Sequence, residues 1–199
     1  DLTRSRGLGD VYKRQVDNFS QGVTQRLGID HQSLKKVNPK IITCSISGFG
    51  DTELNRPAYD NLIQGYAGAM SITGTDKENP VKSGIPIADL GAGLYAVIGI
   101  LSAIQSREKN DSGEHVDISM LDTQVSLLTY MATMHFLSGE NPEPIGNQHM
   151  NHVPFNSYRT LDGFIQIGVV AEDFWPSLIE ALDLRPVSYT HLTLPTTVR

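Results

Sequence analysis

The chain lacks the residues that several classes of protein require. Cys44 is its only cysteine, so neither an internal disulfide framework nor a cysteine-based zinc site is expected, which suits a reducing cytoplasm. The formal net charge is -6, with acidic and basic residues interspersed, and this argues against the basic surface that DNA or RNA binding needs. The longest apolar run, residues 94–104, is too short to span a bilayer and predicts a buried helix instead of a membrane partner.

Both ends lack the pattern of a folded segment. Residues 1–15 contain no apolar stretch of the kind found in a signal peptide, and residues 186–199 have no clear period. We interpret both as foreign or disordered tails. The remaining residues, 16–185, are expected to be an internal piece of a longer protein.

Between the tails, helical and strand patterns alternate as in an α/β protein. Residues 20–39 predict two short helices around Gly28, and residues 40–50 predict a buried strand that ends at glycines. Residues 62–74, 90–107 and 121–137 predict single helices, and residues 115–121 predict a strand. These elements make residues 16–137 part of one large domain.

The composition changes after this domain. Residues 138–156 are rich in Gly, Asn, Pro and His and have no period, which indicates a linker. Residues 157–170 predict a hairpin with its turn at Asp162 and Gly163, and residues 171–184 predict an amphipathic helix. Residues 157–185 are therefore expected to begin a small α+β domain.

Several features that suggest bound groups are incomplete. Gly48 and Gly50 form only part of a dinucleotide-binding fingerprint, because the third glycine is missing. His149 and His152 have no acidic or cysteine partner in a ligand pattern, so two loop histidines are favoured over a metal site. Cys44 lies in the middle of a predicted strand, where a small buried hydrophobic residue is the default. We expect no metal and no permanently bound cofactor.

Asp89 stands between an apolar run and the predicted long helix. We expect it to be the N-cap, with its side chain accepting from the backbone N–H of Gly91 or Ala92 and the helix dipole favouring its ionised form. Capping aspartates outnumber catalytic ones. The same arrangement nevertheless keeps a carboxylate anionic in an apolar place, which a nucleophile requires. Gly91 and Gly93 would let a bulky substrate approach the helix start.

A series of motifs resembles the family III CoA transferases, a group that includes formyl-CoA and carnitine-CoA transferases and, as a relative, α-methylacyl-CoA racemase. In chain order the motifs are VDNFSQG, RLGI, NPKIITCSISGFG, RPAYDNLIQGYAGAMSITG, GIPIADLGAGLYAVIGILSAI, VDISMLDT and GNQHMNHVPFNSYRTLDGFIQI. The resemblance covers nearly all of residues 16–185. It implies an α/β fold with a Rossmann-like large domain and the start of a small α+β domain. It also implies an interlocked homodimer for the full-length protein.

The resemblance further implies a reaction. Asp89 falls on the family's catalytic aspartate, which attacks an acyl-CoA thioester to give an acyl-aspartyl anhydride and passes through an aspartyl-CoA thioester. The substrates are then an acyl-CoA and a carboxylic acid, with coenzyme A entering as substrate. Because water would hydrolyse these intermediates, the site is expected to be dry.

The binding residues are also implied by the resemblance. Asn18, Phe19 and Arg26 match positions that line the CoA site, with Leu27 beside them, and Gly146 is the nearest candidate for the family's glycine-rich lid. Arg26 suits a phosphate, and Phe19 suits adenine or pantetheine. Plain alternatives stay open, with Asn18 as a helix cap, Phe19 as a core anchor and Arg26 as a solvated helix residue.

Tyr59 separates two activities within this resemblance. The racemase relative has a catalytic histidine at this point, and a tyrosine does not replace such a base near neutral pH. Tyr59 is instead expected to donate a hydrogen bond near the acyl or CoA group. Formyl-type enzymes have a lysine where this chain has Pro57, with Arg56 adjacent. A CoA transferase is therefore favoured over a 2-methylacyl-CoA racemase or a non-catalytic CoA-binding protein, both of which stay open.

Overall fold

The computed structural model describes residues 14–52, 54 and 56–184. The chain divides into two compact units, one made of Asp1–Thr73 with Pro80–Glu143 and the other of Gly74–Asn79 with Pro144–Arg199. The predicted tails at residues 1–13 and 186–199 lie outside the described residues. Arg14 and Gln15, which the sequence pattern assigned to the first tail, pair in a parallel sheet with Ile42 and Thr43.

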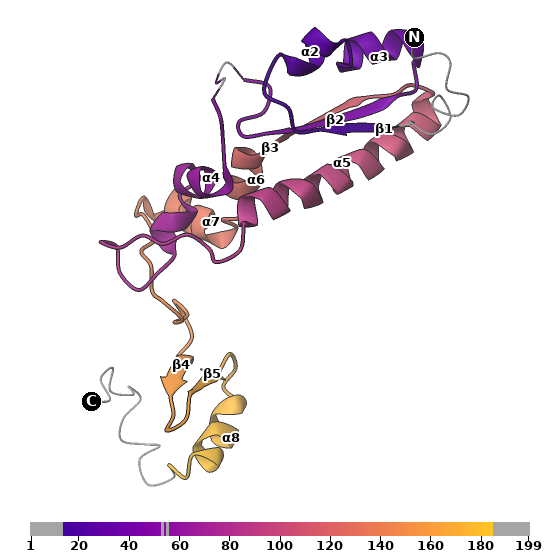
Figure 1. Ribbon diagram of the computed structural model, residues 1–199. Coiled ribbons are helices and arrows are strands. Elements are labelled where there is room, and N and C mark those ends of the chain that lie inside the picture. Colours follow the sequence, from indigo (N-terminus) through magenta and orange to yellow (C-terminus); the bar gives the residue numbers. More distant parts are fainter. Residues whose placement is uncertain (1–13, 53, 55, 185–199) are drawn as a thin grey trace. The chain divides into compact units, whose positions relative to one another are not determined.

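The first unit contains a parallel sheet with strand order β1-β2-β3. Its strands are β1 (Arg14–Asp17), β2 (Ile42–Ser47) and β3 (His115–Ser119). Its helices are α2 (Val23–Leu27), α3 (His31–Val37), α4 (Asp60–Tyr66), the 3-10 helix η1 (Ala69–Ile72), α5 (Ile87–Asn110), α6 (Met120–Ser126) and α7 (Tyr130–Ser138). Helices α2 and α3 lie over one face of the sheet, and α5 runs along the opposite face (Figure 1). The α/β alternation is confirmed.

The sheet has one polar and one apolar face because the side chains of β2 and β3 alternate. Thr43 and His115 are register partners on the polar face, where Thr43 Oγ1 lies 2.8 Å from Nδ1 of His31 at the start of α3. Cys44 and Val116 are partners on the other face, and Val116 packs against Gly99 of α5. The polar face therefore looks toward α2 and α3, and the apolar face toward α5.

A small apolar core lies at the ends of β2 and β3, where α4, α5 and α6 begin. It is formed by Phe49, Ile63, Ala88, Ala92 and Met120. The chain after β2 comes close to the segment before α4 at Gly48, where an added β-carbon would lie 2.1 Å from the β-carbon of Ala58. Any larger residue at this position would push apart the segments that lead into α4. This core fixes the start of α5 and thereby the position of Asp89.

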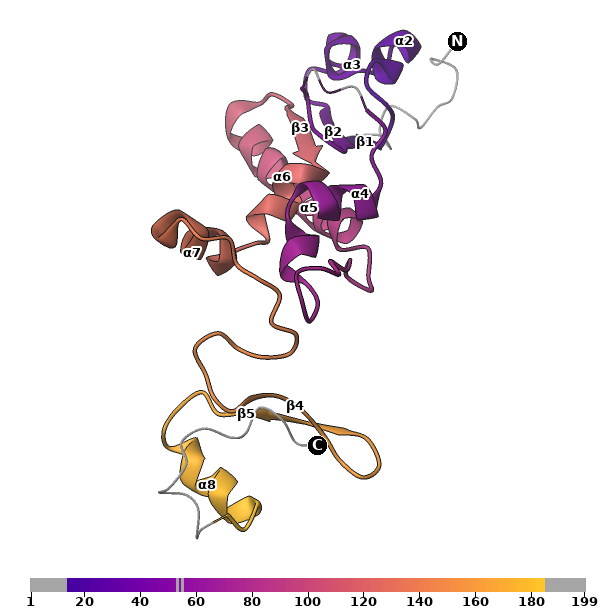
Figure 2. The same cartoon turned by 90° about the vertical axis from the view of Figure 1, so that its left-hand side faces the viewer.

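Two helices predicted as single elements are broken. The helix predicted at residues 62–74 divides into α4 and η1 at Gly68, whose φ of +80° is left-handed. The helix predicted at residues 121–137 divides into α6 and α7 at Thr129, whose φ of +50° interrupts the helix. Helix α7 stands clear of the rest of the first unit in Figure 2. An apolar pattern continues through both breaks, so it did not reveal them.

Helix α5 differs from its prediction as a buried element. Among the described residues it is the one helix that is long and apolar enough to cross a membrane by length and composition. One side packs against β2, β3, α4 and α6, as a core helix does. Leu94, Val97 and Leu101 on its other side are more than half exposed. Only one side of α5 is therefore buried within this chain.

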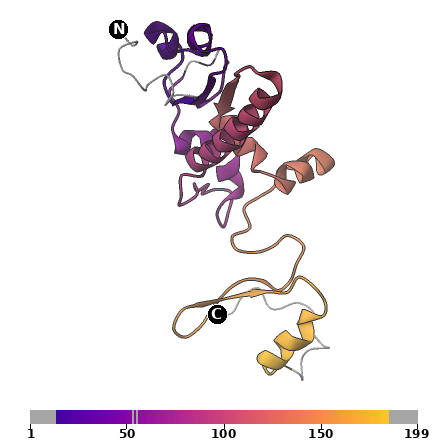
Figure 3. The same ribbon diagram turned by 90° about the vertical axis from the view of Figure 1, so that its right-hand side faces the viewer.

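The second unit contains the predicted hairpin. Strands β4 (Phe155–Arg159) and β5 (Phe164–Gly168) are antiparallel, and the N–H of Thr160 donates to the carbonyl of Gly163 at 2.9 Å across the turn. The hairpin with its turn at Asp162 and Gly163 is thus confirmed. Helix α8 (Phe174–Ala181) follows it, as Figure 3 shows.

A histidine pair on the polar face predicts a pH-dependent stability. Thr43 Oγ1 lies 2.8 Å from Nδ1 of both His31 and His115, and one hydroxyl proton serves only one of these nitrogens. Burial, followed by the charge of His115, lowers the pKa of His31 below its ordinary value. Between that lowered pKa and about 6.5, the unfolded chain binds more protons than the folded one. Stability is therefore greatest above about pH 6.5 and falls as the pH drops below it.

We expect the urea midpoint of the protein to be lower at pH 5.5 than at pH 8. In His31→Gln this difference should be smaller. His149→Gln, in the second unit, is the matched control and should leave it unchanged. If His31→Gln shows the same fall as the unsubstituted protein, the histidine pair is not its cause.

Candidate functional site

A cavity of about 560 Å³ opens on the polar side of the sheet. Its walls come from the end of β1 and the start of α2, from β2, from the segment between β2 and α4, and from β3. We call it the strand-end crevice, formed mainly by residues 17–22, 45–51 and 56–59 with Asp117. Ligands of open α/β sheets bind at such strand ends.

Three of the sequence-predicted site residues meet in the strand-end crevice. They are Asn18, Phe19 and Tyr59. Asn18 Nδ2 donates to the carbonyl of Ile46 at 2.6 Å, so this side chain holds β1 to β2. Its alternative as a helix cap is wrong, because the N-cap of α2 is Gly22. Phe19 is 47% exposed and Tyr59 is 71% exposed. Both offer aromatic surface to a ligand, and Phe19 is no core anchor in this chain.

Arg26 and Leu27 are not brought into the crevice. Both lie at the end of α2 and are exposed, and neither is among the lining residues. The arginine that does line the crevice is Arg56, whose Nη1 donates to the hydroxyl of Tyr66 at 3.1 Å. Arg56 is therefore better placed than Arg26 to meet an anion within the crevice.

The crevice also contains carboxylates. Ser45 Oγ donates to Asp17 at 3.0 Å, and the backbone N–H of Asp51 donates to Asp117 at 2.7 Å. Asp30 lines the same cavity. Carboxylates accept hydrogen bonds from hydroxyl and amine groups and repel phosphates. The interior of the crevice thus suits the hydroxyl-bearing part of a nucleotide better than its phosphates.

Asp89 does not cap α5, contrary to the prediction. The helix begins at Ile87, so Asp89 is its third residue. The capping carboxylate is Asp60 of α4, whose Oδ1 accepts from the backbone N–H of Ala88 at 2.9 Å and of Asp89 at 3.5 Å. A cap from a distant part of the chain leaves the carboxylate of Asp89 available for other contacts.

The protonation of Asp89 also differs from the expectation that the helix start holds it ionised. Partial burial, and next the negative charge of Asp60, raise the pKa of Asp89 above its ordinary value. Asp89 is exposed within this chain, so the expected apolar, water-poor surroundings are not formed by these residues. A carboxylate with a raised pKa is a stronger base and nucleophile once ionised.

Asp60 is the functional candidate that the sequence reasoning missed. It lies next to Tyr59, which lines the crevice, and its carboxylate holds the start of α5. The motif RPAYDN contains it, but nothing in the motif shows that this aspartate contacts a helix start 28 residues further on. Asp60 therefore follows a crevice residue directly and also contacts the turn of α5 that contains Asp89.

Gly146 lies in the second unit. Its backbone is left-handed, with a φ of +64°, and its N–H donates to the carbonyl of Gly74 at 2.7 Å. A residue with a side chain would be strained in this conformation. Gly146 thus belongs to a well-defined turn, and its part in a lid stays a prediction.

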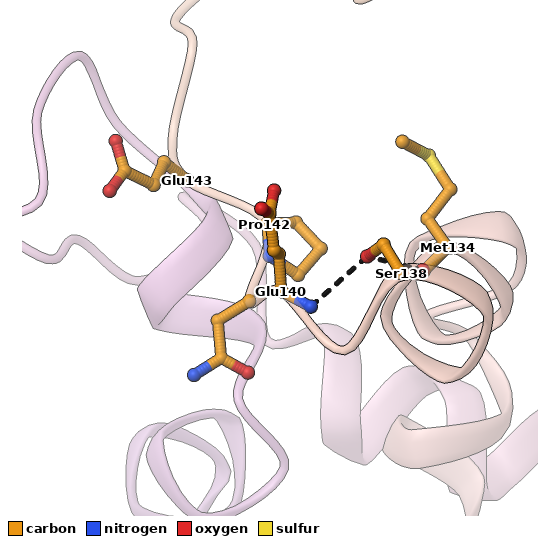
Figure 4. Close-up of a pocket in the computed structure, with 6 residues that line it drawn as sticks. Met134, Ser138, Glu140, Pro142 and Glu143 are labelled. Carbon is orange, nitrogen blue, oxygen red and sulfur yellow. Dashed lines mark hydrogen bonds between the residues drawn. The ribbon is translucent and has the colours of Figure 1, made fainter.

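Other candidate groups do not form a reactive centre. Cys44 is fully buried, and burial together with the charges of Asp17 and Asp117 raises its pKa to about 11, so the thiol stays protonated near neutral pH. A second cavity, of about 570 Å³, lies at the end of α7 and is lined partly by Ser138, Glu140 and Glu143 (Figure 4). None of the sequence-predicted site residues lines this second cavity.

Gly91 and Gly93 differ in their surroundings. A β-carbon at Gly91 would lie 3.0 Å from Thr123 Cγ2 of α6, whereas one at Gly93 would meet nothing within 4 Å. We expect Gly93→Ala to increase the free energy of unfolding by about 0.5–1 kcal/mol through helix propensity. Gly91→Ala should be less stable than Gly93→Ala by about 1 kcal/mol because of overpacking. Urea unfolding of both variants checks this, and equal stabilities would contradict the packing of Gly91 on α6.

Solved structures share this fold. A CaiB/BaiF family protein from Brucella suis matches with a TM-score of 0.79 and 35% identity, over 86% of this chain and 46% of its own. A Mycobacterium tuberculosis protein matches with a TM-score of 0.72 over 89% of this chain and 47% of its own. At 23% identity, it supports the fold alone. The chain is therefore an α/β protein of the CaiB/BaiF structural class.

Sequence comparison gives the family. Residues 10–193 match CoA-transferase family III, and the chain belongs to that family. It is 36% identical over 77% of its length to a succinate–glutarate CoA-transferase from Agrobacterium fabrum. It is 33% identical over 84% of its length to a succinyl-CoA:mesaconate CoA-transferase from Haloarcula hispanica. The chain covers 39% and 44% of the lengths of these two relatives.

Proposed function

We propose that this chain is part of an enzyme that transfers CoA between an acyl-CoA and a carboxylic acid, with Asp89 as the nucleophile. The observation that carries this proposal is the position of the Asp89 carboxylate. It lies at the start of a long helix whose cap is supplied by another residue, Asp60. Asp89 is therefore free of a capping role, and partial burial, followed by the adjacent negative charge of Asp60, raises its pKa. Membership of CoA-transferase family III supports the same reading.

In the proposed reaction the acyl group and CoA are attached in turn to the carboxylate of Asp89. Ionised Asp89 attacks the thioester carbonyl, the C–S bond breaks, and CoA leaves as the thiolate, which gives an acyl-aspartyl anhydride. The thiolate then attacks the aspartyl carbonyl, releases the donor acid and forms an aspartyl-CoA thioester. The acceptor carboxylate attacks that thioester and expels the thiolate again. Attack of the thiolate on the new acyl carbonyl gives the product acyl-CoA and restores Asp89.

The donors that stabilise the tetrahedral oxyanion are proposed to lie outside the start of α5. The N–H of Ile87 donates to Ile85, and the N–H of Leu90 donates to Pro86. The N–H groups of Ala88 and Asp89 both point to Asp60. These first N–H groups of the helix are therefore already paired.

The strand-end crevice is proposed to hold the adenosine end of CoA. Its carboxylates suit the hydroxyl and amino groups of adenosine, while Phe19 offers an aromatic face. Arg56 within the crevice and Arg26 outside it are the proposed phosphate contacts. Remote binding of CoA would then hold the reacting carbonyl against Asp89.

A dicarboxylic acid is the proposed acceptor, because the names of several relatives contain succinate, glutarate, mesaconate or oxalate. The two units are proposed to be a Rossmann-like part of the large domain and the start of the small domain.

The whole protein is proposed to form an interlocked homodimer and to be located in the cytoplasm. It is also proposed to bind no cofactor besides its CoA substrate.

Trapping of the acyl-enzyme tests the proposed function. The full-length protein that carries this segment is incubated with succinyl-CoA, acetyl-CoA and other acyl-CoAs, quenched with hydroxylamine and examined by mass spectrometry. We expect a hydroxamate on Asp89. If acyl-CoAs bind and no adduct forms on Asp89 with any of them, the chain is a non-catalytic CoA-binding protein. Exchange of the α-proton in deuterated water without an acceptor acid would instead indicate the racemase, which Tyr59 argues against.

A further inference from the structure

Gln64 is a buried polar residue that the proposed reaction does not use. It lies on α4, one turn after Asp60, and is 1% exposed. Its Nε2 donates to Asp60 Oδ2 at 2.6 Å, and its Oε1 accepts from the backbone N–H of Ser83 at 2.8 Å. Both ends of the amide are thus satisfied inside the protein. A polar side chain so completely buried and paired fixes the groups around it.

The partners of Gln64 lead directly to Asp89. Asp60 uses Oδ2 for Gln64 and Oδ1 for the N–H groups of Ala88 and Asp89. Two side chains of α4 therefore bind three backbone N–H groups that lie between Ser83 and Asp89. This arrangement fixes both the segment that enters α5 and the first turn of α5.

We propose that Gln64 is a positioning residue, which holds the Asp60 carboxylate against the start of α5 and thereby fixes the position of Asp89. An amide is the side chain that combines a donor for Asp60 with an acceptor for Ser83. A glutamate keeps the acceptor but places a second carboxylate against Asp60, and a methionine provides neither group. This inference rests on the proposed function only where activity is the readout.

The test is a double-mutant cycle between Gln64→Met and Asp60→Asn in the full-length protein. If Gln64 acts through Asp60, Gln64→Met lowers the rate of acyl-Asp89 formation about five-fold, leaves KM for the acyl-CoA within about two-fold, and adds little in the Asp60→Asn background. Gln124→Met is the matched control, since Gln124 is 4% exposed on α6 and its Oε1 has no partner among the described residues. This control should leave the rate per folded molecule unchanged.

A second measurement is independent of activity. In the free protein, a ¹³C NMR titration of the Asp89 carboxyl should show a lower midpoint in Gln64→Met than in the unsubstituted protein, because Asp60 is no longer held beside Asp89. Gln124→Met should not move this midpoint. If Gln64→Met does not fold, Gln64→Glu replaces it in the cycle. It preserves the volume and the acceptor for Ser83, and its added carboxylate should raise the Asp89 midpoint instead of lowering it.

The two proposals fail in different ways. Additive effects of the two substitutions, together with an unchanged Asp89 midpoint, would overturn the positioning role of Gln64. Absence of an acyl adduct in the unsubstituted protein would overturn the proposed function, while the Asp89 midpoint would still decide the role of Gln64.

Discussion

Replacement of Asp89 by asparagine is expected to lower CoA-transferase activity of the full-length protein by at least about 1,000-fold. Asparagine preserves the size of the side chain but cannot form the anhydride with an acyl group. Because the cap of α5 is supplied by Asp60, the substitution should change the free energy of unfolding by less than about 1 kcal/mol. The measurement is the rate of CoA transfer from succinyl-CoA to glutarate as test substrates, with urea unfolding in parallel.

Asp122 provides a matched control for Asp89. It is also an aspartate in the first turn of its helix, α6, and its N–H is capped by another residue, Ser119. Asp122→Asn should retain activity within about two-fold. If Asp89→Asn also retains activity, or loses it only in proportion to a loss of stability, Asp89 is not the nucleophile.

Replacement of Asp60 has the second largest expected effect. Asp60→Asn keeps an oxygen for the cap but removes the negative charge that contributes to the raised pKa of Asp89. A less basic nucleophile is weaker, so we expect kcat at neutral pH to fall about ten-fold. The rate of acyl-Asp89 formation depends on the ionised form, so it is lost as the pH falls through the pKa of Asp89. A lower pKa moves that loss to lower pH in the variant.

Asp60→Ala separates the charge of Asp60 from its cap. It removes both, and we expect an activity loss of about 100-fold with a destabilisation of about 1 kcal/mol. The pH profiles of acylation and the urea midpoints of both variants are the measurements. A pH profile that is the same in Asp60→Asn and the unsubstituted protein would show that the charge of Asp60 does not act on Asp89.

Features set by neighbouring residues were predictable from the sequence. The strand at Ile42–Ser47 follows from a β-branched run that ends at glycines, and the hairpin follows from its Asp-Gly turn. The break at Thr129 was not predictable, because a residue other than glycine with a positive φ has no local signal. The exposed side of α5 was not predictable either, since an apolar helix has the same pattern whether one or both sides are covered.

The candidate site was predictable only in part, for the same reason. Motif order pointed to Asp89, Asn18, Phe19 and Tyr59, and the last three do line one cavity. The cap on α5 was assigned to Asp89 because local rules consider only nearby residues. The true cap is Asp60, which tertiary packing of α4 against α5 brings there. Contacts of this kind become visible only when the chain is folded.

The second unit contains the short segment Gly74–Asn79, which lies in sequence inside the first unit. The chain therefore passes between the units three times, and the carbonyl of Gly74 accepts from Gly146 within the second unit. Cleavage by a protease in the linker before Gly146 would therefore leave the two fragments in contact through the hydrogen bond between Gly74 and Gly146.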